Sequence, residues 1–122
     1  MSSAQVRHVI SWILVVLLAA AYGLGALGKL SGAATQMFAA WGYPAWFATL
    51  IGVLELAGAL GLLIPKTTRY ATLGLAGIML GAAYTHLANG EGMQVLRPGI
   101  FLVVLWVVWW LRRLPGAGGQ SA

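Results

Sequence analysis

Four long apolar stretches, separated by short polar segments, dominate the hydrophobic pattern of this chain. They span residues 9–28, 45–64, 70–88 and 98–111. Because a helix needs about 20 predominantly apolar residues to cross a bilayer, the pattern predicts spanning helices at about residues 9–30, 44–64, 68–88 and 96–112. The expected fold is an all-α, polytopic membrane four-helix bundle.

A shorter amphipathic segment lies between the first two stretches. At residues 33–41, three apolar side chains recur at helical spacing opposite two polar ones, which is typical of a short helix in the membrane interface. These side chains are Met37, Phe38 and Trp41, opposite Thr35 and Gln36. Residues 1–113 are expected to form one transmembrane domain with this interfacial helix between helices 1 and 2, and residues 114–122 a disordered tail.

The basic residues predict how the bundle is oriented. Lysine and arginine are enriched in cytoplasmic loops, and only Lys29 and Arg97 fall on the other side of the expected helices. This distribution predicts a multi-pass cell-membrane protein with both termini in the cytoplasm. The net charge of +5 is thus explained mainly by the orientation of the helices in the membrane. No nucleic-acid partner is expected, because nucleic-acid binding needs a larger continuous basic surface. The five residues of the majority side are Arg7, Lys66, Arg69, Arg112 and Arg113.

Composition limits the redox and metal chemistry that the chain's own residues can perform. The chain is 61% hydrophobic and 7% charged, and it has no cysteine, so thiol chemistry, disulfides and iron–sulfur ligation by its own residues are excluded. A haem with two histidine ligands is not expected, because His8 and His86 belong to opposite faces of the membrane. No metal site is expected either, and any redox role would need a bound cofactor or a partner.

Glu55 is the strongest candidate for function. It is the only ionisable residue in the stretch 45–64, and an ionisable group near the bilayer midplane is costly and commonly functional. A purely structural hydrogen-bonding role remains the alternative for Glu55. Lys29 could simply extend its side chain to the lipid headgroups, and His86 could simply form a hydrogen bond in the membrane interface; these are the structural alternatives to a functional role.

Depth along the expected helices separates the polar residues into two layers. At about 1.5 Å per residue from the inner helix ends, Glu55 lies roughly 15 Å and Tyr22 roughly 21 Å up. Lys29 lies roughly 15 Å above Glu55, more than a lysine side chain spans, so Tyr22 is expected to donate a hydrogen bond to Glu55, with Lys29 and His86 near an outer mouth. The candidate ligand-binding residues are Tyr22, Lys29, Glu55, Tyr84, Thr85 and His86, and the catalytic candidates are Glu55 and His86.

Small residues are expected to organise the helix contacts, because membrane helices approach closely at glycine and alanine. One set, Gly52, Gly58 and Ala59, shares the helical face of Glu55 and is expected to face the interior. A second set follows one side of the next helix: Gly74, Gly77 and Gly81.

The order of four short motifs resembles the DoxX-like family. The segments are YGLGALGKL at 22–30, Gly-Tyr-Pro at 42–44, GVLELAGALGLLIP at 52–65 and GIMLGAAYTHL at 77–87, and the agreement covers about residues 20–110. The family's typical polar positions match Lys29, Glu55 and His86. The resemblance implies an integral membrane four-helix bundle, linked in some members to quinone-dependent oxidoreduction or to membrane complexes that handle oxidative or thiol stress.

Several functions remain open on this basis. The first hypothesis is a redox-associated membrane subunit that binds a quinone or similar lipophilic ligand near Glu55 and works with a membrane or peripheral oxidoreductase partner. The alternatives are a small proton-coupled transporter, a membrane acid–base enzyme using Glu55 and His86, and an assembly subunit that binds other subunits, or copies of itself, through its glycine faces.

Overall fold

The computed structural model describes residues 1–113, which are all-α. This confirms the predicted class of an all-α membrane helical bundle. The predicted disordered tail, 114–122, lies outside the described residues. The elements in chain order are α1 (Ser3–Leu30), α2 (Thr35–Ala40), α3 (Phe47–Leu63), α4 (Thr68–Ala88), the 3₁₀ helix η1 (Gly92–Val95) and α5 (Leu96–Leu111).

Helix α1 begins earlier than its apolar stretch. Ser2 and Gln5 form a capping box, in which the Ser2 side chain accepts a hydrogen bond from the Gln5 backbone at 3.1 Å and the Gln5 side chain accepts one from the Ser2 backbone at 2.8 Å. The helix therefore has 28 residues, or about 42 Å. Because this exceeds the roughly 30 Å of a hydrocarbon core, α1 has to tilt or to extend beyond it.

Three segments of the described chain are long and apolar enough to cross a membrane. They are Ser3–Leu30, Thr68–Ala88 and Gly92–Leu111. Helix α3 is also apolar but has 17 residues, which corresponds to about 26 Å. These spans identify a membrane protein.

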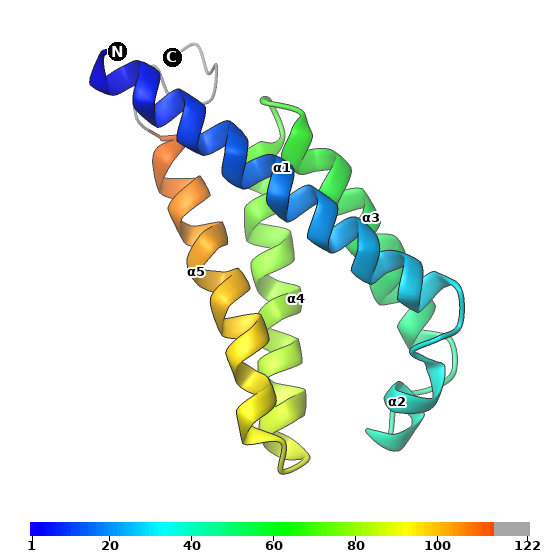
Figure 1. Ribbon diagram of the computed structural model, residues 1–122. Coiled ribbons are helices and arrows are strands. Elements are labelled where there is room, and N and C mark those ends of the chain that lie inside the picture. Colours follow the sequence, from blue (N-terminus) through cyan, green and yellow to red (C-terminus); the bar gives the residue numbers. More distant parts are fainter. Residues whose placement is uncertain (114–122) are drawn as a thin grey trace.

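The long helices form two side-by-side pairs (Figure 1). Helix α1 runs obliquely along α3, while α4 lies beside α5, and the pairs diverge toward the end that carries α2 and η1. At the other end, the start of α1, the α3–α4 turn and the end of α5 come together. Their shared core contains Val15, Leu18, Leu62, Leu75 and Leu105, all 4% exposed or less. We call this end the basic end, defined by Arg7, Lys66, Arg69, Arg112 and Arg113.

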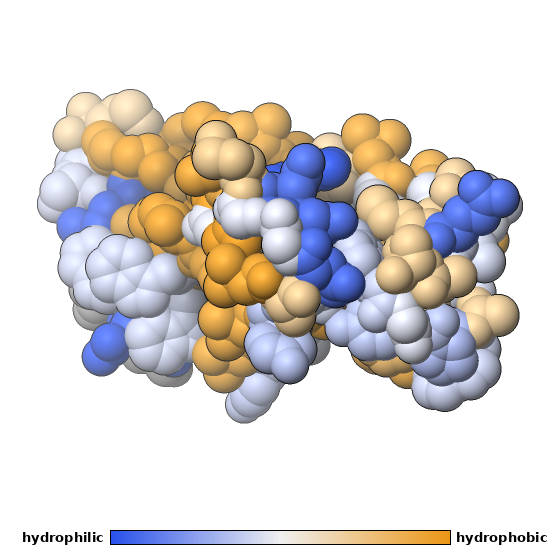
Figure 2. Space-filling model, turned by 90° about the horizontal axis from the view of Figure 1, so that it is seen from below, coloured by the Kyte–Doolittle hydropathy of each residue, from blue (hydrophilic) through white to orange (hydrophobic). Residues whose placement is uncertain are grey.

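The end that carries α2 and η1 is polar at the loop between α4 and α5 and more apolar on the surrounding helices. Seen from that side, hydrophilic surface gathers over the loop that joins α4 to α5, beside apolar surface of the neighbouring helices (Figure 2). Gly90 in this loop has a φ of +71°, a left-handed conformation that glycine adopts readily. The chain therefore reverses sharply after α4.

Glycines behave differently on the two central helices. A Cβ at Gly58 would lie 2.6 Å from Leu75, and one at Gly52 would lie 3.0 Å from Lys29 Cβ, so both allow close helix contact. In contrast, a Cβ at Gly74, Gly77 or Gly81 would meet no atom within 4 Å. The expectation that this second glycine set organises contacts within the bundle was therefore wrong for the described chain.

Candidate functional site

A buried ion pair joins α1 to α3. Lys29 Nζ lies 2.8 Å from Glu55 Oε1, and the two side chains are 21% and 5% exposed. The expectation that depth separates these residues was wrong. The carboxylate of Glu55, the costliest group in the apolar interior, thus has a cation as its partner.

The register of α1 against α3 explains this contact. Gly52 lies opposite Lys29 and Leu30, so α1 ends beside the second turn of α3 and not beside its first residue. Gly52 is one helical turn from Glu55, a rise of about 4.5 Å, which a lysine side chain spans. The depth count failed because it treated the helices as parallel rods that begin at one plane.

Tyr22 lies near this pair without bonding to it. Its side chain is 3% exposed, and its ring is tilted against Phe101 with the ring centres 5.1 Å apart. Its hydroxyl is buried and has no hydrogen-bond partner within residues 1–113. The expected hydrogen bond from Tyr22 to Glu55 is therefore not formed, and the hydroxyl remains available to another group.

A second cluster, which we call the clasp, consists of Trp41, Tyr43, Thr85, His86 and Glu91. His86 Nδ1 lies 2.7 Å from Glu91 Oε1, while the Trp41 indole N–H donates to both oxygens of Glu91 at 3.2 and 3.3 Å. Tyr43 and Thr85 share a hydrogen bond of 2.6 Å between their hydroxyls. The clasp therefore ties the segment between α1 and α3 to the end of α4.

Glu91 is the charged centre of the clasp. The backbone N–H of Glu91 donates to the carbonyl oxygen of His86 at 2.8 Å, and this turn brings the carboxylate back to the imidazole. Hydrogen bonds from His86 and then from Trp41 hold the pKa of Glu91 below its ordinary value. The carboxylate form is thus favoured in the folded protein.

The structure divides the remaining candidates between these clusters and the surface. His86 bonds to Glu91 in the clasp and packs edge-on against Trp41, with ring centres 5.2 Å apart. Thr85 is buried in the clasp, whereas Tyr84 is 70% exposed on the outside of α4. Lys29, Glu55 and Tyr22 are therefore brought together, while His86 and Thr85 belong to the clasp.

Sequence reasoning missed the clasp partners Trp41, Tyr43 and Glu91. One signal was available, because Glu91 is one of only two acidic residues in the chain and follows His86 by five positions. No local pattern links Trp41 to Glu91, which are 50 residues apart.

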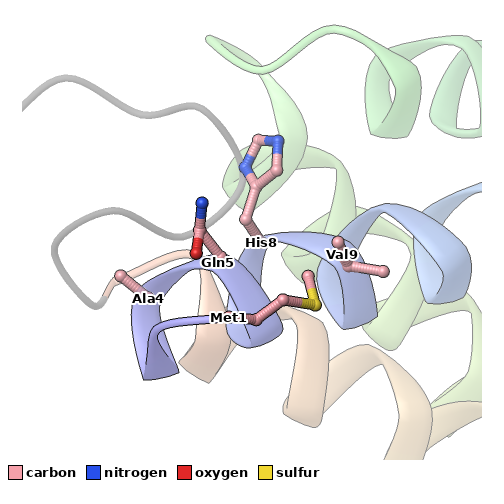
Figure 3. Close-up of a pocket in the computed structure, with 5 residues that line it drawn as sticks. All are labelled: Met1, Ala4, Gln5, His8 and Val9. Atoms are coloured by element: carbon pink, nitrogen blue, oxygen red, sulfur yellow. The ribbon is translucent and has the colours of Figure 1, made fainter.

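Two hollows of the described surface lie away from Glu55. One, of about 300 Å³, is lined by residues at the start of α1 whose side chains spread around the helix without converging (Figure 3). Its single histidine, His8, is at the basic end, far from His86. Another hollow, of about 360 Å³, borders the start of α4. Neither of these two hollows is lined by Glu55 or Tyr22.

The geometry around Glu55 suits a polar group on an otherwise apolar molecule. It offers a hydroxyl donor on Tyr22, a carboxylate on Glu55 and an ammonium on Lys29, set among apolar side chains. The clasp closes the adjacent end of the bundle. Together, these groups can hydrogen-bond a ligand's oxygen and exchange protons with it.

Comparison with known proteins agrees with this architecture. The uncharacterized protein YdgD of Bacillus subtilis (strain 168) is 38% identical over 69 residues, covering 51% of this chain and 60% of that relative. The match thus spans less than two thirds of the relative's length. No solved structure matches the chain. The DoxX-like family matches residues 13–108, a range that contains Tyr22, the Lys29–Glu55 pair and the whole clasp, and the chain therefore belongs to the DoxX-like family.

Proposed function

We propose that this protein is the membrane subunit of a redox system and binds a quinone, or a related lipophilic ligand, beside Lys29 and Glu55. The observation that carries the proposal is the Tyr22 hydroxyl, which is buried and unpartnered within residues 1–113. Buried polar atoms in folded proteins nearly always have a hydrogen-bond partner. A ligand oxygen next to Tyr22 would supply it.

A quinone fits the chemistry of this position. Its carbonyl oxygen accepts a hydrogen bond from a phenol, and its ring and tail suit the aromatic and aliphatic groups near Tyr22, including Phe101. Other lipids with a single carbonyl share part of this chemistry. The quinone is preferred because Glu55 and Lys29 also supply groups that can exchange protons.

The redox step would be divided between two proteins. Reducing a quinone to a quinol takes two electrons and two protons. The electrons would come from a partner oxidoreductase, because the chain has no cysteine for thiol redox chemistry. The protons would reach the quinone oxygens through the Lys29–Glu55 pair, whose lysine is 21% exposed and so connects the buried carboxylate with water.

Quinone retention tests this proposal. The protein would be purified in mild detergent from quinone-containing membranes, and the extracted lipids would be quantified by chromatography. We expect the wild type to retain quinone and Tyr22→Phe to retain about five- to tenfold less, the loss expected for one buried hydrogen bond.

Tyr84→Phe is the matched control, because it removes the same hydroxyl from a side chain that is 70% exposed. It should retain quinone as the wild type does. Absence of quinone from the wild type, together with no binding of added quinone, would overturn the proposal. Equal retention by Tyr22→Phe and the wild type would also contradict it.

A further inference from the structure

The basic end concentrates positive charge without an acidic side chain. Five of the seven lysines and arginines lie there, whereas the chain's two acidic residues lie elsewhere. Glu55 is paired with Lys29 within the bundle, and Glu91 is in the clasp at the opposite end. An anion from outside the protein can therefore serve as a counter-charge for Lys66, Arg69 and Arg113 at this end.

Two of these cations are brought together on one aromatic ring. The Cζ atoms of Arg69 and Arg113 lie 4.4 and 5.1 Å from the ring centre of Trp109. The indole attracts each guanidinium group, so both cations are held at the same side chain. Arg69 also has a buried Nε with no hydrogen-bond partner within residues 1–113. An oxygen-rich anion would satisfy this donor.

A hollow of about 360 Å³ lies beside this pair. It is lined by Lys66, Arg69, Tyr70 and Leu73, which follow one another from the α3–α4 turn into the span of α4. The lining thus changes from cationic to aromatic to aliphatic with depth. The same order of polarity occurs in a phospholipid between its headgroup and its acyl chains.

The face of α4 beyond the hollow is free of obstruction. Gly74, Gly77 and Gly81 continue the side of the helix that carries Tyr70, and a Cβ at any of them would meet open space. From Tyr70 to Gly81 the helix rises about 17 Å, close to the roughly 15 Å of one bilayer leaflet. An acyl chain can lie along this length in close contact with the backbone.

We propose that the hollow of Lys66, Arg69, Tyr70 and Leu73, with Arg113 beside it, binds the phosphate of an anionic phospholipid whose acyl chain lies along the glycine face of α4. The ligand chemistry is a phosphate ester. The aliphatic end of the hollow and the glycine face select a membrane lipid over a soluble phosphate compound. This site is separate from the proposed quinone site.

Native mass spectrometry of the full chain in neutral detergent tests the proposal. The probes are phosphatidylglycerol, phosphatidylcholine and glycerol phosphate. We expect one phosphatidylglycerol to be retained about tenfold better than phosphatidylcholine, with glycerol phosphate weakly bound. Arg69→Gln and Arg113→Gln should each lower phosphatidylglycerol retention about tenfold, the loss of one charge-assisted contact.

Arg97→Gln is the matched control, since it removes the same charge from α5 at the opposite end, and it should change nothing. Lys66→Gln gives a second test at an exposed turn residue if Arg69→Gln disturbs folding, which circular dichroism would reveal. Gly77→Leu should weaken the binding of phosphatidylglycerol and leave the binding of the other two probes unchanged. Four results would each overturn the proposal. The wild type could retain both lipids equally, or Arg97→Gln could lose as much phosphatidylglycerol as Arg69→Gln. Glycerol phosphate could bind as tightly as the lipid, or a lipid-free dimer could cover α4.

Discussion

At the scale of single residues, the Lys29–Glu55 pair is the most consequential contact. A buried charge is tolerated when an opposite charge and good geometry offset its loss of hydration. Glu55 is 5% exposed, whereas Lys29 is 21% exposed. The two partners are therefore unequal, because the lysine ammonium can still reach water if its partner is removed, but the carboxylate cannot.

Removing each partner in turn should reveal this inequality. We expect Lys29→Met to lower the free energy of unfolding by about 3 kcal/mol, since it leaves a buried carboxylate unpaired, and Glu55→Gln to lower it by less. The double variant Lys29→Met/Glu55→Leu should recover much of the loss. Thermal unfolding in detergent, followed by circular dichroism, measures all three. A Glu55→Gln variant that is less stable than Lys29→Met would contradict this account.

At the scale of elements, glycine positions decide how closely the helices approach. Gly52 and Gly58 lie against side chains of α1 and α4, but Gly77 faces open space. All three occur in similar apolar sequence. Only the neighbouring side chains on the facing helix distinguish a glycine that is needed for close helix packing from one that is not.

Alanine substitutions separate the two kinds of glycine. Gly52→Ala should destabilise the protein by about 1–3 kcal/mol, because the added methyl would press α1 away from α3 and lengthen the Lys29–Glu55 contact. Gly77→Ala should be neutral or stabilising by up to about 1 kcal/mol, because alanine favours the helix. Equal effects of the two substitutions in unfolding experiments would show that the register of α1 against α3 differs from the one described.

At the scale of the whole molecule, the two helix pairs meet at the basic end and diverge toward the clasp (Figure 1). The clasp crosses this divergence, because Trp41 and Tyr43 follow α2, whereas Thr85 and His86 lie in the last turn of α4 and Glu91 lies in the loop after it. It therefore holds the two pairs together where the shared core is thinnest. Its strength should influence access to Tyr22 and Glu55 from that end.

Acid should weaken the clasp. The pKa of Glu91 lies below its ordinary value of 4.5, so the folded protein favours the carboxylate. This stabilisation is present above about pH 4.5 and is lost as pH falls through the lowered pKa. Unfolding temperatures should therefore drop below pH 4.5 in the wild type, and the drop should be smaller in Glu91→Gln. Identical pH profiles for the two proteins would exclude a role for Glu91.

Sequence alone predicted the class of protein, which the structure confirms, and a short helix that the structure places at Thr35–Ala40. It also singled out Glu55 as a candidate. Each of these predictions depends on local hydrophobic pattern or on the cost of a charge in an apolar segment. Tertiary structure alone decided the partners. Lys29 meets Glu55 because α1 ends opposite Gly52, and Trp41 meets Glu91 across 50 residues. Helix tilt and register bring such groups together, and they arise from packing between helices, which no local pattern records.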